Sequence, residues 1–142
     1  MYPEANIPVL QLSIDYTKGP QYHYDLSKEL YALRKKGVLI IGSGNMVHNL
    51  RMVDFSRIND NYGYDWALQM NDKFKQLISS GDYKPLINYE SLGREALLSV
   101  PTPEHYLPLI YTLGLKGEKD TISFFNDKAV AGSLTMTSVR IG

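Results

Sequence analysis

Two histidines, His48 and His105, lie at positions where α/β folds usually place their functional residues. His48 follows a short apolar run and a glycine-rich turn, and His105 lies in the first turn of an expected helix. Neutral imidazole is a common ligand of Zn(II) and of non-haem Fe(II). Two imidazoles do not complete a site, so the carboxylates of Asp15, Asp54 and Glu104 are candidates to bind beside them or to orient them. The alternative is that each histidine is a hydrogen-bonded structural residue.

The first element that must position His48 is the run Val38–Ile41. Four consecutive apolar residues, three of them β-branched, predict a short strand buried on both faces. The run ends in Gly42-Ser43-Gly44-Asn45, which is typical of a strand that delivers polar groups to the carboxyl edge of a sheet. The glycine spacing fits neither a dinucleotide-binding fingerprint nor a P-loop.

Upstream residues complete a strand–helix–strand unit. Ile7–Asp15 alternates in polarity and predicts a strand. A helix capped by Asp25 or Ser27 follows and stops at Gly37, immediately before Val38–Ile41. Such a unit implies parallel strands with a right-handed crossover. We therefore expect an α/β fold with a mostly parallel central sheet and helices on both faces, in one domain over residues 1–142.

The second half of the chain supplies the helix that carries His105. Apolar residues at helical spacing predict a long helix over Trp66–Ile78. Thr102 is a candidate N-cap for a later helix, because Pro103 suits the first helical position. Two closing strands are expected at Thr121–Phe125 and Ser133–Ile141.

Composition narrows the class of partner. The chain has 15 basic and 15 acidic residues, so no excess of positive charge favours nucleic acid or an anionic membrane. It contains no cysteine, which excludes disulfides and thiolate metal sites. No apolar run approaches the roughly 20 residues that span a bilayer, and the first residues do not match a signal peptide. We expect a cytoplasmic protein that binds neither nucleic acid nor a membrane.

Five stretches of the chain match one known family: Tyr2–Val9, Gln11–Asp15, Gly42–Leu50, Pro101–Leu109 and Ala131–Ser138. Together they resemble the class III extradiol ring-cleaving dioxygenases, in particular the subgroup of 4,5-DOPA extradiol dioxygenases. The separation of 57 residues between the two histidines (105 − 48) also fits. The resemblance covers essentially the whole chain, but it corresponds only to the C-terminal half of these enzymes.

The resemblance implies roles for individual residues. His105 matches a metal ligand, and His48 matches a histidine that is read either as the acid/base residue or as a further ligand. Asn45, Tyr106 and Ser133 are candidates for the substrate pocket. The implied reaction is cleavage of a catechol such as DOPA by O2, with non-haem Fe(II) or Zn(II) as cofactor.

The same resemblance implies that the chain is truncated or split. The N-terminal half of the family normally supplies two further metal-binding histidines, and Met1 then corresponds to an internal methionine. We expect the chain to pair with an N-terminal-half partner chain or with a second copy, and an inactive α/β remnant is the alternative. A zinc hydrolase is disfavoured because neither an HxxEH nor a GxSxG motif is present.

Overall fold

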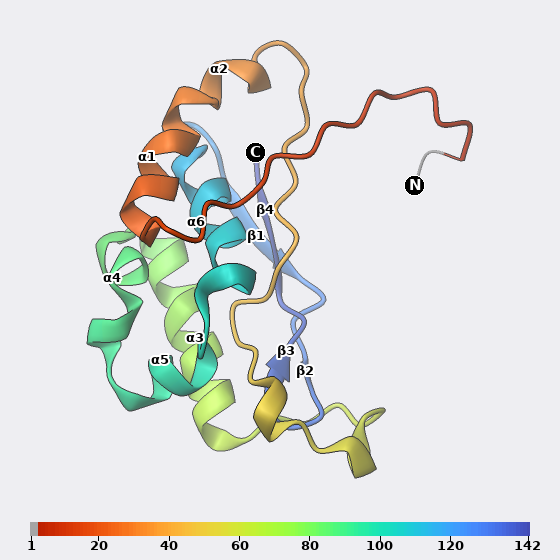
Figure 1. The fold of residues 1–142 in the computed structure, drawn as a ribbon, viewed down its shortest axis with the longest axis vertical. Helices are drawn as coiled ribbons and strands as arrows, with labels where there is room; N and C mark the ends of the chain where they lie inside the picture. The colour runs from red at the N-terminus through yellow and green to blue at the C-terminus, as the bar shows by residue number, and fades with distance from the viewer. Residues whose placement is uncertain (1–2) are drawn as a thin grey trace.

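The computed structural model describes residues 3–142 as a mixed α/β fold with its helices gathered to one side of short strands (Figure 1). Tyr2 of the N-terminal motif lies outside the described residues. The α-helices are α1 (Pro20–Glu29), α2 (Tyr31–Arg34), α3 (Asp65–Ser80), α4 (Lys84–Ile87), α5 (Arg94–Ser99) and α6 (Leu107–Gly114). The 3₁₀ helices are η1 (Leu50–Met52), η2 (Phe55–Arg57), η3 (Tyr89–Leu92) and η4 (Pro103–His105). The strands are β1 (Ile122–Phe125), β2 (Ala129–Val130), β3 (Leu134–Thr135) and β4 (Ser138–Ile141).

Helix α3 confirms the long helix predicted from apolar spacing. Its stripe of buried apolar side chains faces the core and comprises Ala67, Met70, Phe74, Leu77 and Ile78. The helix ends at Gly81, whose φ of 75° is left-handed and therefore suits glycine. At 16 residues it is about 24 Å long. No helix within residues 3–142 is long and apolar enough to cross a bilayer, and the cytoplasmic location stays a prediction.

Helix α1 begins earlier than the sequence predicted. It starts at Pro20, which suits a first helical turn, and not at Asp25 or Ser27. Ser27 lies inside the helix, where its hydroxyl donates to the Tyr24 carbonyl at 2.7 Å. Helix α1 packs closely on α6, because a Cβ added at Gly114 would lie 1.9 Å from Ser27 Oγ. This contact fixes the position of α6, the helix that follows the second candidate histidine.

The strands form two small antiparallel pairs. β1 pairs with β4, with Ile122 opposite Ile141, and β2 pairs with β3, with Ala129 opposite Thr135. These pairs lie within or beside the two closing strands expected near the C-terminus. Val139 of β4 packs against the core formed mainly by the helices.

Two segments expected as strands, Ile7–Asp15 and Val38–Ile41, are not strands in the structure. Both are extended, but no strand of residues 3–142 lies hydrogen-bonded beside them (Figure 1). A strand needs such a neighbour, and an apolar run cannot show whether one is present. Each named strand pair is antiparallel. The mostly parallel central sheet with helices on both faces is therefore not confirmed, whereas the mixture of helices and strands is.

Candidate metal centre

The backbone of His48 is held by neighbours on two sides. Its N–H donates to the Ser99 carbonyl, at the end of α5, at 2.8 Å. On the other side His48 forms an antiparallel bridge with Leu134 of β3. The Thr135 N–H donates to the carbonyl of the preceding residue, Val47, at 3.0 Å. Val47 is completely buried, so the imidazole of His48 extends from backbone that is held firmly in place.

His105 ends the 3₁₀ helix η4 and is separated from α6 by Tyr106 alone. Thr102 takes the N-cap position of η4 but caps no backbone N–H. Its hydroxyl instead donates to Glu104 Oε1 at 2.6 Å, which corrects the capping role that we expected. The same carboxylate oxygen lies 3.5 Å from His105 Nδ1. Thr102 therefore positions Glu104 beside Nδ1 of His105. A metal bound to this imidazole would then lie at the other nitrogen, Nε2.

The glycine-rich turn brings the two histidines together. The Asn45 N–H donates to the His105 carbonyl at 2.8 Å. A Cβ at Gly44 would lie 2.1 Å from that carbonyl oxygen, and one at Gly42 would lie 2.6 Å from the Pro108 oxygen. Only glycine allows the turn to approach the backbone this closely. These glycines therefore allow the turn to pack against the backbone of the second histidine's segment, in agreement with the absence of a nucleotide-binding motif.

The two imidazoles face each other across a short gap. Their ring centroids lie 4.7 Å apart with an interplanar angle of 64°. His48 is only 4% exposed, and both of its ring nitrogens are buried without a hydrogen-bond partner among the described residues. Potential ligand atoms of His48, Glu104 and His105 all lie within 4.8 Å of one another. Buried polar atoms rarely lack a partner, so the arrangement indicates a place for a further group.

Of the three carboxylates considered beside the histidines, only Glu104 joins them. Asp15 accepts hydrogen bonds from the backbone and side chain of Thr17. Asp54 accepts from the hydroxyls of Ser56 and Tyr62. Both side chains organise local turns, and neither belongs to the group around His48.

Burial decides the charge of His48. Desolvation lowers the pKa of His48 below its ordinary value of 6.5, the nearby His105 lowers it further, and Glu104 opposes both. The hydrogen bond from Thr102 lowers the pKa of Glu104. At neutral pH the cluster therefore presents a neutral imidazole at His48 and a carboxylate anion at Glu104. Metal ligation needs these protonation states.

The donor set is chemically suited to a divalent metal. Two imidazoles and one carboxylate are the ligand types of facial-triad Fe(II) sites and of catalytic zinc sites. Because the ring nitrogens of His48 have no hydrogen-bond partner among the described residues, His48 could bind a metal without losing a hydrogen bond. The residues present therefore fit the metal that the sequence resemblance implied.

The three expected substrate contacts occupy different surroundings. Asn45 is half-buried, and its Nδ2 donates to the Thr135 carbonyl at 2.7 Å. Ser133 is fully buried, and its hydroxyl donates to the Asn49 carbonyl at 2.8 Å. Tyr106 is also fully buried, and its hydroxyl donates to the Leu86 carbonyl at 2.9 Å. Their roles toward a substrate stay predictions.

Two further polar residues lie beside His48, and no sequence pattern pointed to them. The hydroxyls of Ser99 and Thr135 are buried and have no hydrogen-bond partner among the described residues. Their backbones contact His48 and Val47, but no motif or spacing relates them to these positions. His23, by contrast, is a structural histidine: its Nδ1 lies 3.1 Å from the Tyr111 hydroxyl and its Nε2 3.3 Å from the Lys18 carbonyl.

Known proteins resemble this chain over its whole length. No family model matches it. It is 44% identical over 146 residues to 4,5-DOPA dioxygenase extradiol of Escherichia coli (strain K12), and the match covers 100% of this chain and 52% of that protein. It is 37% identical to a protein of the same name from Mirabilis jalapa, over 83% of this chain and 43% of that protein. This chain is related to the extradiol dioxygenases.

A solved structure gives the same relationship in space. The crystal structure of an uncharacterized protein from Escherichia coli K12 matches with a TM-score of 0.90 and 41% identity, over 100% of this chain and 58% of that one. The family resemblance expected from the motifs around His48 and His105 is confirmed. The chain spans about half the length of the curated relatives that it matches, in agreement with the half-length resemblance.

Proposed function

We propose that this chain carries the C-terminal share of an extradiol ring-cleaving dioxygenase site. The proposed substrates are a catechol such as DOPA and O2, and the proposed cofactor is non-haem Fe(II) or Zn(II). The observation that supports this most is the buried imidazole of His48, which has two unpartnered nitrogens and lies against His105. The names of the relatives give the reaction class.

His105 is the proposed metal-binding residue, Glu104 is the carboxylate that orients it, and His48 is either a further ligand or the acid/base residue. A bound metal would lower the pKa of the catechol hydroxyls and hold both reactants together. A neutral imidazole has one free lone pair, so His48 cannot bind a metal and accept a proton at the same time. Its lowered pKa keeps that lone pair free at neutral pH in either role.

As the base, His48 would take the proton of one catechol hydroxyl and return it later in the reaction. Its backbone bonds hold the ring in place, and its burial limits exchange of the proton with water. Glu104, fixed by Thr102, would keep a proton on His105 Nδ1 and so direct His105 Nε2 to the metal.

Asn45 is the best placed of the three predicted substrate contacts. Its Nδ2 donates to the Thr135 carbonyl, but its side-chain oxygen accepts no hydrogen bond from the described residues. That oxygen can accept a hydrogen bond from a substrate hydroxyl. We keep Ser133 and Tyr106 in the proposal as residues that shape the site, since both hydroxyls already donate to backbone carbonyls.

Catalysis is proposed to need groups beyond this chain. The curated relatives are about twice as long as the matched region, and the resemblance implies that the rest supplies two further metal-binding histidines and part of the substrate pocket. An N-terminal-half partner chain is the favoured source of those groups, and a second copy of this chain is a further possibility. The alternative function is an inactive subunit that acts only through such a partner.

The test is oxygen consumption with L-DOPA. The full chain is co-expressed with the part of the Escherichia coli relative that it does not match, then loaded with Fe(II). The proposal predicts one O2 consumed for each L-DOPA, with formation of a ring-opened product. His48→Ala and His105→Ala should each abolish both signals, whereas Glu118→Gln, at an exposed position, should leave them unchanged. Retained ring opening in either histidine variant contradicts the proposal, and so does absence of oxygen uptake in the co-expressed protein.

A further inference from the structure

Two extended segments expose an unusual amount of apolar surface. In the first, Val9 is 88% exposed, Leu10 96% and Leu12 60%. In the second, Leu39 is 70% exposed and Ile41 68%. Scattered exposed apolar residues are common, but consecutive ones in extended backbone mark an interaction surface. In Figure 1 the first segment projects away from the helices, and the second runs beside β4.

The backbone of both segments also lacks hydrogen bonds to the described residues. From residue 39 to residue 44, no N–H or carbonyl forms a hydrogen bond with any described residue. The same holds from residue 4 to residue 14. An extended chain with free N–H and carbonyl groups is a template for pairing with another strand. The side chains and the backbone therefore point independently to the same missing neighbour.

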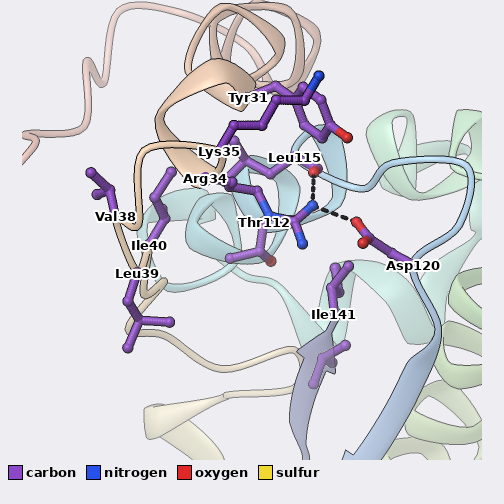
Figure 2. Close-up of a pocket in the computed structure, with 11 residues that line it drawn as sticks. Tyr31, Arg34, Lys35, Val38, Leu39, Ile40, Thr112, Leu115, Asp120 and Ile141 are labelled. Carbon is purple, nitrogen blue, oxygen red and sulfur yellow. Dashed lines mark hydrogen bonds and ion pairs between the residues drawn. The ribbon is translucent and has the colours of Figure 1, made fainter.

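A groove continues this surface toward the strands. A cavity of about 380 Å³ lies between the second segment, α6 and β4. Figure 2 shows Val38, Ile40 and Ile141 around it, with Arg34 donating to the Leu115 carbonyl and paired with Asp120. Arg34 and Asp120 are thus paired with each other, whereas Lys35 adds a further charged group to the lining. Apolar side chains of the second segment and of β4 line the rest, so the lining is mixed, as in most contacts between polypeptides.

We propose that the segments 7–14 and 38–41, with this groove, form a docking surface for strands of a second α/β polypeptide. The proposed occupant resembles the part of the relatives that this chain does not match. The Escherichia coli relative matches the whole of this chain, exposed segments included, and has about as much chain again with which to cover it. A second copy of this chain would bring only the same two unpaired segments and no additional chain to cover them. The inference deepens the proposed function, on which it rests, by naming where the partner binds.

The test is capture of that partner, measured without metal or substrate. The full chain carries a tag and is co-expressed with the unmatched part of the Escherichia coli relative. The surface predicts that the two polypeptides co-purify in equal amounts. It also predicts that the amides of residues 39–44 exchange hydrogen quickly in the chain alone and slowly in the complex.

Paired variants locate the contact. Leu39→Asp with Ile41→Asp should reduce capture about tenfold or more, because both side chains would become charged inside the interface. Leu97→Asp, at a position 51% exposed on α5, is the matched control and should capture normally. All three side chains are exposed, so the unfolding temperature should stay unchanged.

Three results overturn the proposal: recovery of the tagged chain alone, capture that the Leu39 and Ile41 substitutions do not reduce, and self-association through the same residues. Because the readout uses no metal, capture with no ring opening would count against the proposed function alone.

Discussion

The ring of His48 lies 4.7 Å from the ring of His105, although 57 residues separate them along the chain. The backbone bond from Asn45 to the His105 carbonyl and the close packing of Gly44 create this pairing. Both rings then lie beside Glu104, so a buried imidazole, a half-buried carboxylate and an exposed imidazole bring the donor atoms of a metal centre together.

Glu104 should control metal affinity. Glu104→Gln keeps a hydrogen-bond acceptor for Thr102 but removes the negative charge beside His105. We expect Zn(II) to bind about 10–100-fold more weakly, as for other groups that orient a ligand. Isothermal titration of the full chain measures this, with Glu118→Gln as the exposed control. Unchanged affinity in Glu104→Gln would remove this residue from the centre.

Gly44 should tolerate no side chain. In Gly44→Ala the new Cβ would meet the His105 carbonyl oxygen at 2.1 Å, so the backbone must shift. We expect a loss of about 1–3 kcal/mol in the free energy of unfolding, together with weaker metal binding. Gly19→Ala is the control, because nothing lies within 4 Å of a Cβ there. Urea unfolding that gives the same free energy for both variants would refute the close approach.

The low pKa of His48 makes stability depend on pH. Burial lowers the pKa of His48 in the folded state, whereas the unfolded chain titrates near 6.5. Between these values the unfolded state binds more protons, so stability rises with pH. The contribution of His48 is complete above about pH 6.5 and is lost as the pH falls toward the folded-state pKa.

Urea unfolding of the metal-free chain at about pH 7.5 and pH 5.5 tests this sign. The wild type should lose more stability on acidification than His48→Gln, which cannot titrate. Carboxylates such as Glu104 titrate below this range, so they contribute little to the difference. An equal loss in the two proteins would show that His48 is not buried as a neutral group.

Tyr106 should affect stability more than metal binding. Tyr106→Phe leaves the Leu86 carbonyl without its buried donor, and we expect a loss of about 1–3 kcal/mol in the free energy of unfolding. Zn(II) affinity should stay at the wild-type value, since the hydroxyl is directed into the core. Thermal unfolding and metal titration on the same sample separate the two effects. A change in affinity without a change in stability would place Tyr106 at the site instead.

Local patterns predicted the helices well because the information is local. The apolar period over Trp66–Ile78 depends only on which residues face the core, and α3 follows it. The prediction of a buried strand at Val38–Ile41 was wrong, since Leu39 and Ile41 are mostly exposed. The apolar run could not reveal that no strand of the described chain lies beside it, because pairing is a property of distant residues.

The candidate site was predictable in its residues but not in its geometry. The positions of His48 and His105 after a glycine turn and at a helix start suggested that both reach one edge of the fold. The choice of Glu104 over Asp15 and Asp54 depends on side-chain bonds that no spacing encodes. The burial of Tyr106 likewise depends on which way its ring points from the start of α6.

The central claim is that His48 and His105 lie together at one metal centre, whereas His23 does not. Nuclear magnetic resonance of the chain with ¹⁵N-labelled histidine, titrated with Zn(II), measures all three rings at once. The account predicts that ring-nitrogen signals of His48 and His105 move together and saturate at one Zn(II) per chain. The signals of His23, whose nitrogens already bond to Tyr111 and Lys18, should stay in place. Movement of His23, or no movement of His48 and His105, would contradict the account.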